Sequence, residues 1–504
     1  MRELRLALFA ATLVWGWLPA AAEEAKKPKP KKAAPPSPTL VAALKAYEGN
    51  DFFTASRELH RVVEGETKDS AESTQRAEFW LGKSLYHLHL YSGALSYFAR
   101  IATKGNAHAY YLAIPKWLLA LESKLPGAGA ALEMKRYDRV ALKQPALESV
   151  KDETLYRQAL VHAQEGSDKL AVELLQTVGT AGAFGARAAL LLGVVQARAL
   201  RRAEAATGLK AALALAERPP RPGMKQPKEE VTLALARLHL LAGEHEACAQ
   251  RYAQIPAGSP HSLEAMLHGA WAQLQRRDPA RALDALHRLH TPHFAHYYFP
   301  EALVLRAAIY AQRGQPERAE EALKALRSRF VPFATYLETT TRVKKDPADL
   351  LDELRKIQRR TVPVAKETAR MVETVLEAPD LQERAALLDE LDRELGLVQA
   401  APAAWKATMI AGIVLQDLTL LKSLQVSTGG QAARRRMSLL AARIGALAKQ
   451  ADTLGATLRA CRQARRTPTL LPDYRPDPAR LFVPGSPLRD ALGTLEVKVV
   501  VGCR

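Results

Sequence analysis

Four histidines at even spacing form the cluster in this sequence that is best suited to metal chemistry. They are His287, His290, His293 and His296, and imidazoles three residues apart on a helix share a face from which they can ligate a metal. Pro292, however, interrupts such a helix after the second histidine, and no cysteine or carboxylate stands beside the cluster at a suitable spacing. We therefore interpret the segment as a polar turn between helices, with a metal site as the weaker alternative.

The three cysteines indicate one cross-link rather than a reactive thiol. Cys461 lies at the end of the last long helix that the sequence predicts, and Cys503 lies in a terminal strand. In an oxidising compartment, a Cys461–Cys503 disulfide would close a loop of about 40 residues and stabilise the fold by roughly 3–4 kcal/mol. Cys248 occupies a position where small residues recur, so we predict a packed, unreactive side chain.

Patterns that would carry catalysis or cofactor binding are missing from the sequence. The glycine-rich stretch Gly179–Gly185 follows a predicted helix rather than a strand, and it lacks the Lys-Ser/Thr pair of a phosphate-binding loop. The sequence contains neither Gly-x-Ser-x-Gly nor His-Glu-x-x-His. We therefore expect no enzymatic activity and no cofactor.

Basic residues give the chain a formal net charge of +19, and residues 434–504 contribute 14 basic and only 5 acidic side chains. Such a charge favours an anionic partner, for example a lipid headgroup or an envelope polymer. The residues predicted to contact it are Arg434, Arg435, Arg436, Arg443, Arg462, Arg465 and Arg466. A composition biased towards arginine, with no anionic partner at all, is the alternative explanation.

The first 22 residues have the pattern of an export signal. Two arginines precede the apolar run Leu6–Leu18, and three alanines follow it, which predicts cleavage before Glu23; a retained anchor is the alternative. Residues 23–38 are rich in lysine and proline and should form an extended linker. We expect an exported, periplasmic protein, with a place at the outer-membrane periphery left open, and export makes nucleic acid a poor partner.

Between Ser262 and Pro332 the sequence repeats one pattern twice. Apolar residues at helical spacing lead out, the chain turns, and a second helix returns, with Ala282 and Ala319 in equivalent positions 37 residues apart. Because such a hairpin cannot bury its apolar face alone, we expect stacked hairpins on both sides of it.

These hairpins resemble the tetratricopeptide (TPR) repeat, whose period is roughly 34 residues. In the best match, small residues let the paired helices approach, and Phe98 fills the groove between one hairpin and the next. A degenerate unit is expected at Tyr110–Tyr137. The repeat-packing positions are Leu81, Gly82, Ala94, Phe98, Ala171, Leu192, Gly193, Ala205, Cys248, Ala282, Ala307, Tyr310 and Ala319.

Within that family, the chain is similar to divergent periplasmic TPR proteins of deltaproteobacterial type. This class includes outer-membrane assembly lipoproteins and Tol-system partners. The segment Tyr298–Ala302 and the tail from Phe482 to Cys503 carry the similarity, although Ser486, Pro487 and Ala491 depart from the tail pattern. The resemblance implies a scaffold that binds another envelope protein.

After residue 332 the pattern changes to long helices. Lys406, Asp417 and Lys422 interrupt the most apolar of them, which makes it too short to cross a membrane. We expect helices at Asp346–Gln358, Val364–Leu397, Ala404–Val426 and Gln431–Ala464, a turn at Gly429–Gly430, and a strand at Glu496–Val501 that would be unstable without a partner.

The sequence as a whole predicts an all-α protein. We expect a signal peptide at 1–22, a linker at 23–38, a TPR-like α-solenoid of helical hairpins at 39–332, a long-helix bundle or coiled-coil region at 333–466, and a short irregular tail with one strand at 467–504. The expected function is a non-enzymatic cell-envelope scaffold that binds another envelope protein. The alternative is a binder of anionic envelope polymer or membrane surface through the basic C-terminal helix.

The predicted disulfide can be tested by counting thiols. Denaturation without reductant should expose one reactive thiol, that of Cys248, and reduction should release two more, because the bond between Cys461 and Cys503 holds them. Three reactive thiols in the unreduced, denatured protein would show that the bond does not form.

Overall fold

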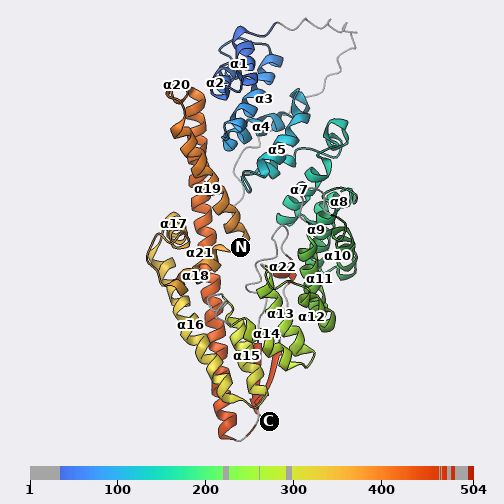
Figure 1. Cartoon of the computed structure of the whole chain (residues 1–504), viewed down its shortest axis with the longest axis vertical. Helices are drawn as coiled ribbons and strands as arrows, with labels where there is room; N and C mark the ends of the chain where they lie inside the picture. Colours follow the sequence, from blue (N-terminus) through green and yellow to red (C-terminus); the bar gives the residue numbers. More distant parts are fainter. Residues whose placement is uncertain are drawn as a thin grey trace, which may run out of the picture.

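The computed structural model describes residues 35–219, 226–259, 261–290, 298–464, 466, 468–473, 478–482 and 498–503, and most of these lie in helices (Figure 1). The all-α prediction is confirmed. The predicted signal peptide, most of the linker and most of the tail lie outside the described residues.

The first sixteen helices pair, in chain order, as eight hairpins. They are α1 (Pro38–Glu48) with α2 (Phe52–Val63), α3 (Ala71–His87) with α4 (Tyr91–Lys104), α5 (Ile114–Glu122) with α6 (Ala130–Met134), α7 (Lys151–Gln164) with α8 (Asp168–Leu175), α9 (Gly185–Arg198) with α10 (Arg202–Ala216), α11 (Lys228–Ala242) with α12 (His245–Ala253), α13 (Ser262–Gln275) with α14 (Pro279–Arg288), and α15 (Pro300–Gln312) with α16 (Pro316–Val343). Short 3-10 helices lie at Gly105–Ala107, Tyr111–Ala113, Ala141–Lys143 and Pro145–Leu147.

Seven of the eight hairpins turn through the same backbone geometry. One residue in each turn is left-handed, with φ between 59° and 81°, and the next N–H donates to the carbonyl five residues back, as Leu90 does to Leu85 and Gln315 to Tyr310. The left-handed residues are Asn50, His89, Gly166, Leu200, Gly243, Arg277 and Gly314. The exception is α5–α6, the unit that the sequence predicted to be degenerate. A turn repeated in this way gives successive hairpins the same shape, so they can stack as a TPR-like solenoid.

Small residues set the distance between the two helices of a hairpin. A Cβ atom on Gly82 would lie 2.7 Å from the Phe98 ring, and one on Gly193 would lie 2.6 Å from Leu209 Cγ. Both glycines therefore give their space to a side chain of the returning helix, which is the packing that the repeat pattern predicts.

Beyond the hairpins lie α17 (Pro347–Gln358), α18 (Lys366–Leu376), α19 (Pro379–Ala400), α20 (Ala403–Lys406) and α21 (Met409–Gln463). The prediction of one helix over 364–397 was wrong, because Ala378 is extended and Pro379 starts a new helix. Helix α16, by contrast, continues through the exposed Pro332, so it crosses the predicted division between solenoid and bundle at residue 332.

The predicted turn at Gly429–Gly430 was also wrong, because α21 runs through it as one helix. Both glycines are buried, and a Cβ atom on Gly430 would lie 1.8 Å from the carbonyl oxygen of Pro347. A Cβ atom on Gly429 would lie 2.9 Å from Leu351 Cδ2. The glycines thus let the start of α17 rest on the backbone of α21, and they serve packing rather than a change of direction.

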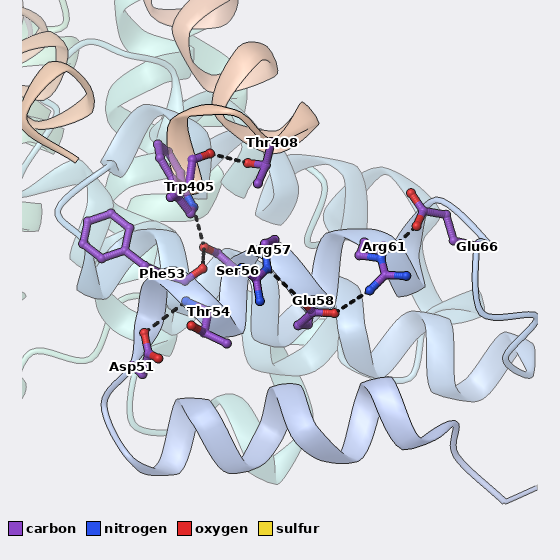
Figure 2. A network of polar contacts seen from close by, with 10 residues as sticks. All are labelled: Asp51, Phe53, Thr54, Ser56, Arg57, Glu58, Arg61, Glu66, Trp405 and Thr408. Atoms are coloured by element: carbon purple, nitrogen blue, oxygen red, sulfur yellow. Dashed lines mark hydrogen bonds and ion pairs between the residues drawn. The ribbon is translucent and has the colours of Figure 1, made fainter. Parts of the chain in front are cut away.

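The long helices bring the chain back to its N-terminal hairpins. Figure 1 shows α1 to α5 near the tip where α19, α20 and α21 meet, with α7 to α12 on the side of the molecule away from α16, α17 and α18. At this tip the buried Trp405 indole donates to Ser56 Oγ at 3.0 Å, and its ring contacts Phe53 edge-on (Figure 2). Val414 of α21 packs against Gly93 of α4.

A buried carboxylate makes the second contact of this closure. Glu394 of α19 is fully buried and accepts from Ser92 N at 3.1 Å and from Ser92 Oγ at 2.5 Å. Ser92 lies in the first turn of α4, whose N-terminus has no side-chain cap of its own. Glu394 therefore caps the N-terminus of α4 from 302 residues away in the chain.

The tail has two described strands rather than the one predicted. The strand β2 (Lys498–Cys503) pairs antiparallel with β1 (Pro468–Asp473), a segment that the sequence suggested to be irregular. Pairing supplies the backbone hydrogen bonds that a lone strand of this length would lack. The short helix α22 (Pro478–Leu481) is held by Arg237 of α11, whose Nη1 donates to the Leu481 carbonyl at 2.5 Å.

Among the described helices, α21 is the one long and apolar enough to cross a membrane by length and composition alone. It contacts α16, α17 and α19 along its length, and Val414, Leu418 and Ile444 are buried in the core. Met409, Leu415, Leu420 and Leu424 of the same helix are exposed, so the contacts within the bundle account for only part of its apolar surface.

We predict that Gly430→Ala lowers the free energy of unfolding by about 1–3 kcal/mol, because the new methyl group must push α17 away from α21. The matched control is Gly445→Ala on the same helix, where a Cβ atom would meet nothing within 4 Å. It should be neutral or stabilise by up to about 1 kcal/mol through helix propensity. Chemical denaturation measures both, and equal effects of the two substitutions would contradict the close approach.

The Glu394 contact predicts a pH dependence of stability. Burial raises the pKa of Glu394 to about 7, against the lowering effect of its hydrogen bonds from Ser92. Between about pH 4.5 and 7 the folded protein therefore holds a proton that the unfolded chain releases. The contribution of Glu394 to the free energy of unfolding is highest below this window and falls as the pH rises through it to 7. Relative to Glu394→Gln, the wild type should lose up to ~3 kcal/mol across this window.

Thermal denaturation at several pH values checks this, with the difference between the two proteins as the readout. The control is Glu338→Gln, which changes an exposed glutamate of α16. A difference between wild type and Glu394→Gln that does not change with pH would contradict the buried carboxylate.

Candidate protein-interaction face

Aromatic side chains gather on the first helices of the first three hairpins. Tyr47 lies on α1, Trp80 and Tyr86 on α3, and Trp117 on α5, and all four are only partly buried. Spacings of three or four residues along α3 place Trp80, Lys83 and Tyr86 on one side of that helix. Because successive hairpins stack, side chains of α1, α3 and α5 form one surface, which we call the aromatic face.

The rings of the aromatic face contact one another across the hairpins. Tyr47 meets Trp80 edge-on with ring centroids 4.6 Å apart, and Tyr86 meets Trp117 at 5.2 Å. The exposed His87 stacks on Phe52, the first residue of α2, at 4.7 Å. Burial and the nearby Lys83 lower the pKa of His87, which favours its neutral form. Rings that contact one another in this way form a rigid apolar surface, and their side chains lose little conformational entropy when a partner binds.

Lys83 lies at the centre of this face. Its ammonium is 3.6 Å from the ring centroid of Trp80 and 4.8 Å from that of Tyr47, and within 5.7 Å of the rings of Phe79 and Trp117. Burial lowers the pKa of Lys83. Attraction to the ring faces partly replaces the water that the ammonium has lost.

Helices α20 and α21 cover a different part of the first hairpins. α20 contacts α2, and α21 contacts both α2 and α4, so the second helices of the first two hairpins are packed inside the molecule. The aromatic face comes mainly from the first helices. Closure thus buries the second helices, while side chains of the first helices keep part of their surface exposed.

The structure places two of the four predicted histidine ligands, and both bond to the protein itself. His287 Nε2 lies 2.5 Å from the Tyr310 hydroxyl, and His290 Nδ1 donates to the Leu286 carbonyl at 2.7 Å. His293 and His296 lie outside the described residues. In the part of the chain that is described, no group of three or more His, Cys, Asp or Glu side chains could hold a metal.

The cysteines lie in two different settings. Cys248 has a free thiol that is fully buried, and burial raises its pKa to about 12, so the thiol is packed and protonated. Cys461 is disulfide-bonded, and β2, which ends at Cys503, packs against the same helix α21. The side chain of Cys503 lies outside the described residues, so the Cys461–Cys503 pairing stays a prediction.

The predicted anionic-surface arginines do not form one exposed patch. Arg434 donates to the carbonyls of Lys344 and Lys345 just beyond the end of α16, Arg443 pairs with the buried Glu301, and Arg436 is itself buried. Arg462 lies 3.7 Å from Glu317, Arg435 and Arg466 are exposed, and Arg465 lies outside the described residues. A count of charges along the sequence cannot show that a helix end binds Arg434 and a buried carboxylate binds Arg443.

The predicted repeat-packing residues lie in the interior with one exception. Leu81, Gly82, Ala94, Phe98, Ala171, Gly193, Ala205, Cys248, Ala282, Ala307, Tyr310 and Ala319 are buried. Leu192 is only partly buried, and its neighbour Leu191 takes the buried position.

Sequence reasoning missed the aromatic face, and it also missed Arg237. Twelve of the 31 aromatic residues fall between Tyr47 and Trp117, and this local excess is a signal that could have identified the face. Arg237 gave no such signal, because its partners, Glu264 and the Leu481 carbonyl, come from distant parts of the chain. Burial alone would raise the pKa of Glu264, but Arg237 and His268 lower it to about 2.

Comparison with known proteins finds similar solved structures, each at low sequence identity and a low TM-score. The TPR domain of P58(IPK) is 15% identical, with a TM-score of 0.17, over 67% of this chain and 98% of that one. A complex of Naa15/Naa10 bound to HypK-THB matches at 13% identity and a TM-score of 0.26, over 90% of this chain and 69% of that one. A circular tandem repeat protein matches at 16% identity and a TM-score of 0.11, over 84% and 90%.

No protein-family model and no curated protein sequence matches the chain. Because the TM-scores of the solved structures are low, these similarities carry no argument about the fold. The description of this chain as TPR-like rests on its own stacked hairpins and their repeated turn.

Proposed function

We propose that this protein is a non-enzymatic scaffold of the cell envelope that holds another envelope protein on its aromatic face. The observation that carries the proposal is the set of partly exposed, interlocked rings of Tyr47, Trp80, Tyr86 and Trp117 across three successive hairpins. Tyrosine and tryptophan are enriched where binding energy is concentrated in protein interfaces. A solenoid of hairpins also offers an extended surface rather than a single deep site.

The location in the envelope rests on the sequence alone. The pattern of residues 1–22 favours export, and the lysine- and proline-rich linker would give the folded part some reach from its point of attachment or release. A periplasmic place, near the outer membrane, is therefore part of the proposal.

The binding of anionic polymer by the last long helix is not favoured. Arg434, Arg436 and Arg443 are engaged inside the molecule, and of the other predicted arginines the structure describes Arg435, Arg462 and Arg466, which are exposed. A protein partner on the aromatic face fits the exposed side chains better.

Capture of partners from an envelope extract tests the proposal. Wild-type protein should retain a partner at about 1 M salt, where charge contacts are screened to roughly 3 Å, because apolar contacts persist. Tyr86→Ala together with His87→Ala should reduce the retained amount at least about tenfold, since both residues lie at the accessible part of the face.

The matched control removes a similar apolar area elsewhere. Leu420 and Leu424 of α21 are 67% and 54% exposed, and the pair Leu420→Ala and Leu424→Ala should leave capture unchanged. Thermal denaturation of each variant verifies folding. Equal retention by wild type and by the Tyr86/His87 variant would refute the aromatic face as the binding surface.

A further inference from the structure

We propose that Lys83 determines what the aromatic face binds: a protein segment in which an aspartate or glutamate is flanked by aromatic or aliphatic side chains. This inference rests on the proposed function and names the chemistry of the partner.

The ammonium of Lys83 is surrounded by rings instead of by a counter-ion. Rings from α1, α3 and α5 lie within 5.7 Å of it, and no ion pair of Lys83 with a carboxylate is found among the described residues. Two other lysines of these hairpins have such a partner, since Lys104 lies 2.5 Å from Glu78 and Lys135 lies 2.7 Å from Glu165. Lys45 and Lys116, for which no ion pair is found among the described residues, are exposed to solvent, unlike Lys83. Lys83 is thus a half-buried cation for which no carboxylate partner is found among the described residues.

An incoming carboxylate would supply that charge at little cost. Lys83 is already held by the rings and already partly desolvated, so the ordering and dehydration that weaken most surface ion pairs are partly complete before the partner arrives. The apolar neighbours of the carboxylate would then cover the ring faces.

A carboxylate fits this site better than a phosphate. Phosphate and nucleic-acid sites gather several arginines or lysines, whereas the aromatic face has one lysine and a histidine whose pKa is lowered. The net charge of +19 also attracts acidic proteins during encounter.

Selection from a random peptide display library on the immobilised full chain tests the inference, and it works whichever protein the partner is. Wild type should enrich peptides with an acidic residue between aromatic or aliphatic residues. Lys83→Met keeps a long apolar side chain but removes the charge, and it should lose the acidic preference. Lys210→Met, at an exposed lysine of α10, removes the same charge elsewhere and should keep the preference.

Affinities of one enriched peptide and its Glu-to-Gln analogue then quantify the effect. The acidic peptide should bind wild type at least about tenfold more tightly than the analogue, the size expected of a charge-assisted hydrogen bond, and Lys83→Met should bind both alike. Enriched peptides without acidic residues, or the same acidic preference in Lys83→Met, would overturn the role of Lys83 while leaving the aromatic face as a binding site.

Two other outcomes are distinguishable. Enrichment that is unaffected by Tyr86→Ala with His87→Ala, or no enrichment at all, would count against the proposed function itself. A photo-cross-linking amino acid at position 86 that captures residues 1–34 of the same chain would identify the chain's own N-terminal segment as the occupant, and would overturn the acidic partner.

Discussion

Closure of the chain on itself is the constraint on which the rest of the structure depends, and it requires two polar groups to be buried with their hydrogen bonds made. Glu394 caps α4 through Ser92, and Trp405 donates to Ser56, across 302 and 349 residues of sequence. An unpaired buried carboxylate or indole would cost free energy, so these contacts are favourable only in the one arrangement that pairs them. These contacts therefore specify where the long helices dock, and they also hold the helices in that place.

Docking at this place divides the first hairpins into a covered and an accessible part. The second helices, α2 and α4, pack against α20 and α21, and the first helices contribute Trp80, Lys83 and Trp117 to the aromatic face. A solenoid whose ends are joined has fewer ways to flex than an open one. Because rigid surfaces lose less entropy when they bind, the closure prepares the aromatic face for a partner.

Two residue types that the sequence suggested would serve a turn and an exposed surface, glycine and arginine, instead contribute to packing between helices. Gly430 lets α17 lie against α21, where a side chain would have forced the two helices apart. Arg434 and Arg443 satisfy the end of α16 and the buried Glu301, and so they tie the basic helix into the molecule. Part of the charge that looks like an exposed surface in the sequence therefore belongs to the internal structure, whereas Arg435, Arg462 and Arg466 are exposed.

The sequence by itself determined the hairpins, because helical periodicity, small residues and turn signals act over distances of a few residues. Gly82 shows this, since the repeat pattern predicted that it lets the paired helices approach, and the Phe98 ring of the returning helix lies against it. The partners of Glu394, Trp405, Gly430 and Arg237 lie far away in the chain, and only the tertiary structure decided them. The same holds for the aromatic face, because rings on three separate helices meet around Lys83 only after the hairpins have stacked.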